Sequence, residues 1–321
     1  MGALVLLMAA GLACSLPIGP SLPPTPGPFP VEGVRQLTND FAYYHKLLWS
    51  PAGEWIAAGR CPVVNFQPNC LEEQETVLLD PNSGDARSVD VRSSLSGRTL
   101  SFPIDWYPDG SRLLMYLAEW KAGTASGYDY KYVIYSPSSG DTDDLLFDGT
   151  IIAWDASGER LLVTMPLEGD EWSLGWLDPS TGKLTTDLRY RGADRPLGDY
   201  ALSPDDRILL QGDTPLPATC RRVFAYVLGS GRPFHVFMQE ACFPAWAPDG
   251  SRLAYASPSS QGAQTLRLMV SDADGSGAHP VFATEFPGSL ASPAWSHDGE
   301  RIVFTNAGQG NANAVFVAAA P

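Results

Sequence analysis

One phrase recurs six times along the chain, and this repetition constrains the fold more than any other feature. Each copy is an apolar run that ends in Trp, a tight turn, and a second apolar run, as in I-D-W-Y-P-D-G-S-R-L-L-M from Ile104. The marker positions are Trp49, Trp106, Trp154, Leu202, Trp246 and Trp295. Their spacing lies near the ~40–50 residues of one propeller blade, so the repeat predicts a ring of six blades.

The turn of the repeat has a physical explanation. In S-P-D-G, Pro sets the backbone of the first corner, and Gly adopts the left-handed conformation that closes a strand hairpin. In the fourth copy Asp206 stands in place of Gly, and Asp is among the few residues that tolerate this conformation. We therefore expect the turns to be structural, and the repeated Trp to pack between blades.

A second apolar hairpin separates successive copies, as in V-I-Y-S-P-S-S-G-D-T from Val133. Two hairpins make four antiparallel strands, which is one blade. After Asn313 the last copy supplies one strand only, whereas residues 33–38 (G-V-R-Q-L-T) supply a spare strand at the other end. The sequence therefore predicts an all-β, six-bladed β-propeller of four-stranded antiparallel blades, with the last blade closed by an N-terminal strand that leaves no free sheet edge.

The N-terminus has the pattern of a targeting segment. Residues 3–13 form an apolar run that is too short to span a bilayer and is followed by Cys14. G-L-A-C resembles a bacterial lipobox, which implies lipidation of Cys14, although Gly11 stands where Leu is preferred and no Lys or Arg precedes the run. An ordinary signal peptide with an incidental cysteine is the alternative.

The sequence predicts three parts of the chain and a cellular location. Residues 1–14 are a signal peptide with a lipobox-like cysteine, 15–32 a Pro-rich extended linker, and 33–321 the propeller. We expect a periplasmic or cell-surface protein that touches the membrane through its lipid anchor only.

The odd number of cysteines supports lipid attachment at Cys14. Five cysteines in a secreted chain leave one unpaired, and Cys14 is the natural odd one. Local sequence leaves three pairings open for the other four, and the predicted strand order favours Cys61 with Cys70 and Cys220 with Cys242.

Three phrases resemble the repeat of TolB-like, WD-like propellers: V-R-Q-L-T from Val34, W-S-P-A-G-E-W-I-A from Trp49, and W-A-P-D-G-S-R-L-A-Y from Trp246. The resemblance covers residues 33–321 and implies a periplasmic or surface protein that binds a protein or another ligand. The same repeat forms the gating propeller of prolyl-oligopeptidase-like enzymes. Such a hydrolase needs a G-x-S-x-G nucleophile elbow, which this sequence lacks.

Other chemistry is equally unsupported by the sequence. The net charge of −15 argues against a nucleic-acid surface and fits a soluble protein that repels its neighbours, so we expect a monomer. The D-A-D-G-S-G phrase from Asp272 lacks the later acidic ligand of an EF-hand. The histidines fall on separate predicted elements, so we expect no metal and no cofactor. They are His45, His235, His279 and His297.

The connections should differ between the two faces of the ring. Short turns within hairpins occupy one face, and the long connections between hairpins and between blades occupy the other, where binding residues tend to lie. Both predicted disulfides belong to the long-loop face. Aromatic and acidic residues, which suit a sugar, a peptide or a basic surface, gather there. These candidate binding residues are Tyr43, Tyr44, His45, Phe66, Trp120, Tyr128, Asp129, Tyr130, Asp170, Glu171 and Trp172.

These features favour a non-catalytic extracytoplasmic binding protein whose long-loop face binds a protein or a small ligand. The alternative is a carbohydrate-active enzyme with two carboxylates ~5–10 Å apart at the central channel. A purely structural scaffold is the third possibility.

Overall fold

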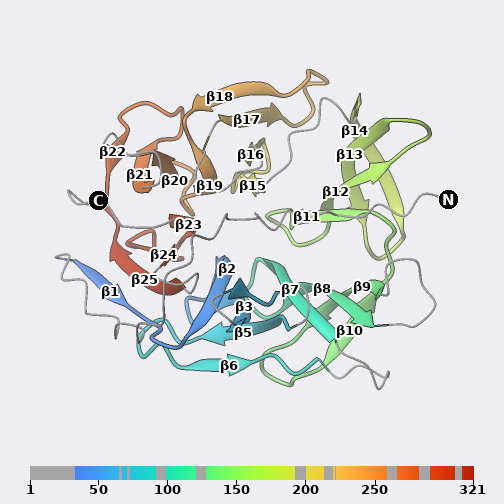
Figure 1. The fold of residues 1–321 in the computed structure, drawn as a ribbon. Coiled ribbons are helices and arrows are strands. Elements are labelled where there is room, and N and C mark those ends of the chain that lie inside the picture. The colour runs from blue at the N-terminus through green and yellow to red at the C-terminus, as the bar shows by residue number, and fades with distance from the viewer. Residues whose placement is uncertain are drawn as a thin grey trace.

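The computed structural model describes residues 33–64, 67–70, 73–91, 99–120, 128–191, 200–212, 220, 222–258, 266–281, 290–307 and 313–321. These ranges contain strands and turns and no helix, so they hold no helix that could cross a membrane. Six antiparallel sheets surround a central axis (Figure 1), which confirms the six-bladed propeller.

The strands of each blade follow one another outward from the axis. Blade 1 comprises β2 (Ala42–Trp49), β3 (Ile56–Val64), β5 (Glu75–Leu79) and β6 (Ala86–Ser88), with β4 (Gln67–Pro68) paired to β3. Blade 2 comprises β7 (Thr99–Trp106), β8 (Leu113–Trp120), β9 (Tyr128–Tyr135) and β10 (Thr142–Leu145). Blade 3 comprises β11 (Thr150–Trp154), β12 (Leu161–Pro166), β13 (Glu171–Asp178) and β14 (Lys183–Arg191).

The second half of the ring repeats this order. Blade 4 comprises β15 (Tyr200–Leu202), β16 (Ile208–Gly212), β17 (Arg222–Val227) and β18 (His235–Gln239). Blade 5 comprises β19 (Cys242–Trp246), β20 (Arg252–Pro258), β21 (Leu266–Asp272) and β22 (His279–Pro280). Blade 6 comprises β23 (Leu290–Trp295), β24 (Arg301–Ala307), β25 (Asn313–Ala319) and, from the other end of the chain, β1 (Val34–Gln36).

The N-terminal strand closes the ring as predicted. β1 pairs antiparallel with β25, with Val34 opposite Ala318. Just beyond the strand, the N–H of Leu37 donates to the carbonyl of Val315 at 2.7 Å, and the N–H of Val315 donates to Oγ1 of Thr38 at 3.0 Å. The sixth blade is therefore built from both ends of the described chain.

The repeat turns have the predicted backbone. Gly53, Gly110, Gly158, Gly250 and Gly299 have φ between 71° and 76°. Asp206, which replaces Gly in the fourth copy, has φ 57°. Its carboxylate also accepts the N–H of Ala156 in the turn of blade 3, at 2.9 and 3.0 Å. Asp206 thus occupies the left-handed corner and joins two neighbouring turns.

The repeated tryptophans pack between blades as expected. Trp49, Trp106, Trp154 and Trp295 are buried. The Nε1–H of Trp106 donates to the carbonyl of Leu48 in blade 1 at 3.0 Å, and that of Trp295 donates to Ala245 in blade 5 at 3.1 Å. These bonds use equivalent positions in two pairs of blades, so the indoles hold successive blades in register.

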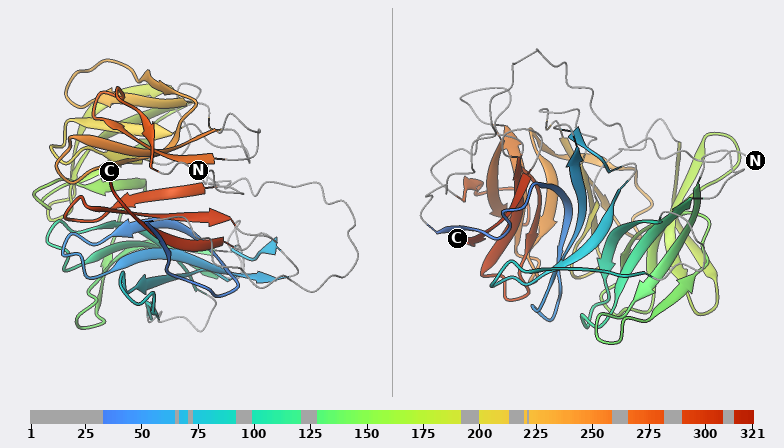
Figure 2. Two further views of the ribbon diagram at one scale, coloured as in Figure 1. Left: turned by 90° about the vertical axis from the view of Figure 1, so that its left-hand side faces the viewer. Right: turned by 60° about the horizontal axis from the view of Figure 1, so that its bottom comes forward.

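Tight turns within hairpins gather at one end of the strands (Figure 2, left). We call this end the turn face. The opposite end, which we call the loop face, receives the connections between the second and third strands of each blade and those between blades.

Candidate functional site

Five of the predicted binding residues belong to a continuous series of rings that we call the aromatic row. It consists of Tyr43, His45, Phe102, Tyr116, Tyr130, Tyr128 and Trp120. The row begins on β2, where side chains alternate between the two sides of the strand. Tyr43 and His45 therefore share one side, with ring centroids 6.2 Å apart, and His45 lies 6.5 Å from Phe102 of blade 2.

Blade 2 continues the row from its inner strand to its third strand. Phe102 and Tyr116 are directly opposite each other across β7 and β8, and their rings are 6.1 Å apart. Tyr116 stacks on Tyr130 of β9 at 5.5 Å and 9° between planes. The Tyr128 ring lies 6.3 Å from the Tyr130 ring and forms a T-shaped pair with Trp120, with ring centroids 5.5 Å apart. Neighbouring rings along the row are therefore at the separations of favourable aromatic pairs.

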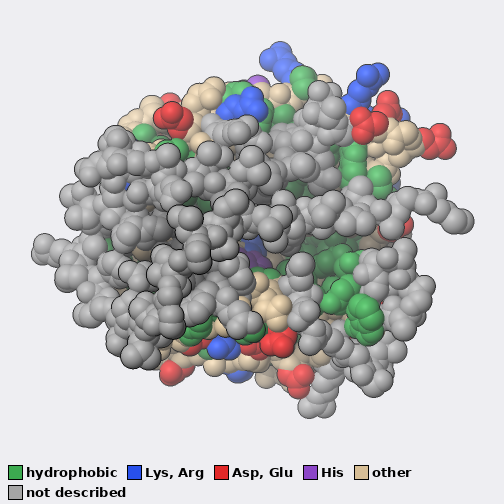
Figure 3. Space-filling model, in the orientation of Figure 1, with side chains coloured by type: hydrophobic (Ala, Val, Ile, Leu, Met, Phe, Trp, Pro, Cys, Tyr) green, Lys and Arg blue, Asp and Glu red, His purple; other side chains and the backbone are tan. Residues whose placement is uncertain are grey.

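The outer end of the row is exposed at the loop face. Trp120 is 51% exposed, Tyr130 is 50% exposed, and the nearby Leu146, which follows β10, is 90% exposed. Figure 3 shows hydrophobic side chains at the surface over the position of β8 and β9.

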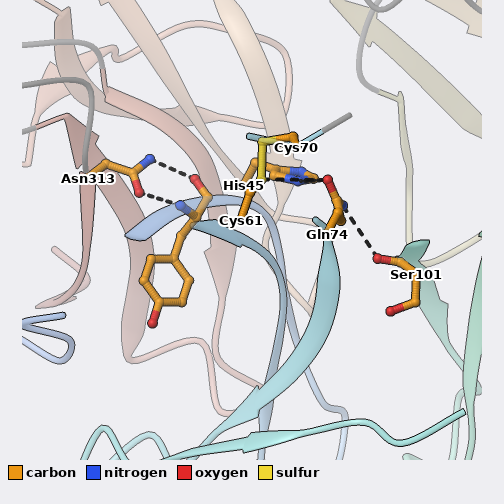
Figure 4. The surroundings of a disulfide bond; sticks show 7 residues. His45, Cys61, Cys70, Gln74, Ser101 and Asn313 are labelled. Atoms are coloured by element: carbon orange, nitrogen blue, oxygen red, sulfur yellow. Dashed lines mark hydrogen bonds between the residues drawn. A yellow bond between two sulfur atoms is a disulfide. The ribbon is translucent and has the colours of Figure 1, made fainter. Parts of the chain in front are cut away.

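His45 is held from several sides (Figure 4). Its Nε2 lies 3.0 Å from Oε1 of Gln74, and Nε2 of Gln74 donates to the carbonyl of Ser101 in blade 2 at 3.4 Å. Its ring also covers Gly59, where a Cβ atom would lie 2.5 Å from the His45 Cε1. Only a glycine at position 59 leaves room for the imidazole in this orientation.

The predicted disulfide pairing is confirmed. Cys61 is bonded to Cys70, and Cys220 is bonded to Cys242. The sulfurs of Cys61 and Cys70 also lie near the His45 imidazole. Because both sulfurs are consumed by the disulfide, this group offers no thiolate to a metal ion.

The remaining predicted site residues are distributed differently. Tyr44 is buried, and its hydroxyl donates to the Asp40 carboxylate at 2.8 Å; burial and that carboxylate raise the pKa of the phenol. Trp172 is also buried, so neither ring belongs to the exposed surface. Asp129, Asp170 and Glu171 are exposed. Asp129 lies on β9 of blade 2, Asp170 directly precedes β13 of blade 3, and Glu171 is the first residue of β13. Phe66 and Cys14 lie outside the described residues.

Two members of the row were not predicted from the sequence. Phe102 and Tyr116 lie within strands, where aromatic residues are ordinarily core residues. The sequence spacing does contain a signal. Tyr116 and Trp120 are four residues apart, and Tyr128 and Tyr130 are two apart, so within a strand each pair of side chains lies on the same side. Their alignment across strands depends on the register of β8 and β9, which pairs Trp120 with Tyr128.

A cavity of about 320 Å³ lies at the ring axis, and three carboxylates line it. Asp155 pairs with Arg160 at 2.9 Å. Asp206 holds the turn of blade 3 as described above. Asp105 accepts the N–H groups of Trp106 and Trp154, both at 2.9 Å. Each carboxylate therefore has a hydrogen-bonding partner within the ring.

The pKa of the Asp105 carboxyl is raised. Burial raises its pKa from 3.8 to about 6, although the N–H of Trp154, the charge of Lys46 and the N–H of Trp106 oppose this shift. By contrast, hydrogen bonds from Arg160 and its neighbours keep the pKa of Asp155 below its usual value despite burial. The cavity thus contains carboxyl groups whose proton affinities differ.

Comparison with known proteins identifies the fold but no family. No family model matches the chain, and no curated protein matches it. TolB from Acinetobacter baumannii has a TM-score of 0.52 and 15% identity, and the match covers 87% of this chain and 63% of that protein. This chain therefore spans less than two thirds of the length of that TolB.

Two further structures match over most of both chains. A TolB candidate from Agrobacterium tumefaciens has a TM-score of 0.54 and 14% identity, covering 89% of this chain and 94% of its own. A candidate gluconolactonase has a TM-score of 0.52 and 14% identity, covering 91% and 93%. At such identities the likeness shows the fold, which binding proteins and enzymes share. The structural neighbours of this chain thus include TolB-like and related propeller proteins.

Proposed function

We propose that this chain is a non-catalytic extracytoplasmic binding protein, anchored through Cys14, that captures a protein partner on the loop face of blades 1 to 3. The observation that carries the proposal is the aromatic row, which ends in the exposed rings of Trp120 and Tyr130. Large aromatic side chains supply much of the energy of protein interfaces when a partner removes them from water. Their support within the strands limits the entropy that binding would cost.

The charges around the row favour a partner with basic side chains. Exposed carboxylates lie on the same blades 2 and 3: Asp129, Asp143, Asp144, Asp148, Glu168, Asp170 and Glu171. Of these, Asp144 already pairs with Lys131 at 3.3 Å. Arg or Lys from a partner could lie over the face of Trp120 or Tyr130 and pair with a nearby carboxylate. The overall charge of −15 would also speed the approach of a basic partner.

The disulfides support the extracytoplasmic part of the proposal. Disulfides persist in secreted and periplasmic proteins and are rare where thiols are kept reduced. The pairing of Cys61, Cys70, Cys220 and Cys242 leaves Cys14 as the remaining cysteine, as a lipobox requires.

A carbohydrate-active enzyme is the competing function, and one observation favours it. The raised pKa of Asp105 beside the lowered pKa of Asp155 resembles the unequal pair that acid–base catalysis uses. However, Asp105 holds two backbone N–H groups, and Asp155 holds Arg160. Because both carboxylates are engaged by groups of the ring itself, this geometry disfavours their use as a catalytic acid and base.

Binding to defined peptides tests the proposal. The mature chain is titrated with an oligo-arginine peptide and with an oligo-glutamate peptide of equal length. We expect binding of the first only, weakened roughly 3- to 30-fold in Trp120→Ala and Tyr130→Ala, because a cation over an aromatic ring contributes about 0.5–2 kcal/mol. Affinity capture from an envelope extract with the same variants then identifies the partner.

Matched controls separate the row from exposed apolar surface in general. Val227 and Val236 of blade 4 are 44% and 41% exposed, and their replacement by Ala should leave binding unchanged. Equal binding by the wild type and both aromatic variants would contradict the proposal. Hydrolysis of an oligosaccharide that Asp105→Ala abolishes would establish the enzyme instead.

A further inference from the structure

The inner strands of three consecutive blades carry an unusual backbone at equivalent positions. Lys46 of blade 1, Phe243 of blade 5 and Ser292 of blade 6 each lie three residues before the marker Trp of their blade. Their φ angles are 50°, 53° and 52°, and each lies in a β-bulge of its strand. This left-handed region favours glycine and costs other residues roughly 1–2 kcal/mol.

The residues at these positions border the same cavity. All three residues line the cavity at the ring axis. The N–H of Lys46 donates to Oγ of Ser292 at 3.2 Å, which joins blade 1 to blade 6 at this level. Glycine would adopt this left-handed conformation at a lower energy cost. The chain nevertheless has Lys46, Phe243 and Ser292 there, which bring an ammonium, a phenyl ring and a hydroxyl to the cavity lining. Strained residues that persist around a cavity are typical of ligand sites.

The Lys46 ammonium has no direct hydrogen-bond or ion-pair partner among the described residues. Ser292 accepts the Lys46 N–H and retains its own O–H to donate. An ammonium and a hydroxyl on adjacent blades can together hold a carboxylate.

Asp105 provides the opposite charge on blade 2. The other five copies have Leu48, Ala153, Ala201, Ala245 and Ala294 at this position. The blade fold therefore does not require an acid there. Each oxygen of Asp105 accepts one backbone N–H and retains capacity for a further donor. The charge of Lys46 lowers the pKa of Asp105 electrostatically, but no ion pair joins the two side chains in the described part of the chain.

Together these groups make a cavity with separated opposite charges and an apolar wall. The wall includes Phe243, Pro244, Trp246 and Pro293. A cavity of about 320 Å³ is within the size range of small-molecule sites. A singly charged ligand would satisfy only one of the two charges, whereas a zwitterion would satisfy both.

We infer that the central cavity binds a small apolar zwitterion of the α-amino-acid class. Its carboxylate lies on Lys46 and Ser292, its ammonium on Asp105, and its side chain against Phe243. This site is independent of the loop-face partner, because none of these four residues belongs to the aromatic row or its acidic surroundings.

Calorimetric titration of the full mature chain tests the inference. The probes are L-leucine and L-phenylalanine, compared with 4-methylpentanoate, which is leucine without its ammonium, and 3-methylbutylamine, which is leucine without its carboxylate. We expect one or both amino acids to bind. Loss of either charged group should weaken leucine-type binding by at least about tenfold, because a buried charge then loses its partner.

Variants at one position distinguish a binding role from a structural one. Lys46→Met should abolish binding, whereas Lys183→Met on exposed β14 should leave it unchanged. Lys46→Gly should also abolish binding while leaving the melting temperature unchanged or higher, since glycine suits the left-handed backbone. A purely structural Lys46 predicts a lower melting temperature and no effect on binding.

Three results would overturn the inference. The first is no heat of binding from either amino acid at up to about 10 mM, well into the weak range of specific affinities. The second is equal binding by wild type and Lys46→Met. The third is 3-methylbutylamine or 4-methylpentanoate binding as tightly as leucine.

Discussion

The side-chain amide of Asn313 and the backbone of Tyr44 form a reciprocal pair of hydrogen bonds between the last blade and the first. The N–H of Tyr44 donates to Oδ1 of Asn313 at 2.5 Å, and Nδ2 of Asn313 donates to the Tyr44 carbonyl at 2.7 Å. Both residues are buried. Asn313 thus acts as a short piece of strand that joins β25 to β2 across the blade boundary.

Replacing Asn313 with Ala should destabilise the propeller. The buried N–H and carbonyl of Tyr44 would both lose their partner, at a cost of about 2–4 kcal/mol in the free energy of unfolding. Urea denaturation measures the loss, and Asn82→Ala on an exposed turn serves as the control. A loss as small as that of the control would mean that water replaces the amide at this boundary.

Deleting residues 33–38 should lower the stability of the whole ring. The deletion removes β1 and the contacts of Leu37 and Thr38 with Val315, and it exposes the edge of β25. We expect a fall of several degrees in melting temperature and more aggregation. Deleting residues 15–32 should leave melting unchanged. A ring that melts normally without β1 would contradict closure by this strand.

Removing the Cys61–Cys70 disulfide with the double Ser variant should cost about 2–3 kcal/mol of unfolding free energy, because the unfolded chain gains freedom. Non-reducing peptide mapping should find this pair together with Cys220–Cys242. The loss of the first disulfide should also weaken partner binding, since Cys61 and Cys70 lie beside His45 of the aromatic row. Unchanged binding would show that the row does not depend on it.

Changing Cys14 to Ser should release the protein from the membrane fraction. A lipid on Cys14 is the proposed attachment, and serine cannot form the thioether. Fractionation followed by immunoblotting measures the change, with Cys61→Ser/Cys70→Ser as the cysteine control. Persistent membrane association of Cys14→Ser would rule out this anchor.

The Asp105 carboxyl should make stability depend on pH. Its pKa in the folded state, about 6, is higher than the ordinary value of 3.8. Between these values the folded protein binds more protons than the unfolded chain. This contribution to stability is fully present below pH 3.8 and is lost as the pH rises through about 6.

Urea denaturation across pH 4 to 7 tests this dependence, with Asp105→Ala as the comparison because Ala occupies the equivalent position in four other blades. The variant should lose part of the fall in stability between pH 4 and 6. Parallel curves for the two proteins would show that Asp105 titrates normally.

The fold could be predicted because its determinants are local and repeated. Each turn needs one residue with a left-handed backbone, and the sequence places glycine there in five copies and Asp206 in the sixth. The spare strand at residues 33–38 followed from counting strands. The pairing over a long distance that the prediction needed, β1 with β25, follows from the same count because the ring must close.

The site was predicted less completely because it depends on register. Tyr43, Tyr44 and His45 are consecutive, and composition alone could not tell that Tyr44 points away from its neighbours into the core. The bulge beside Lys46 shifts the register of β2, and a bulge leaves little trace in a sequence. Asp105 and Lys46 were therefore missed, although both lie within clearly predicted strands.

The pairing of β1 with β25 also sets the order of events during synthesis. β1 leaves the ribosome well before its partner β25, the last of the described strands, so the ring stays open until translation has passed Ala319. Contacts between such distant segments form slowly, and the unfinished ring exposes edges that invite aggregation. The proposed export of the chain before folding agrees with this order, since closure waits for β25 in any case.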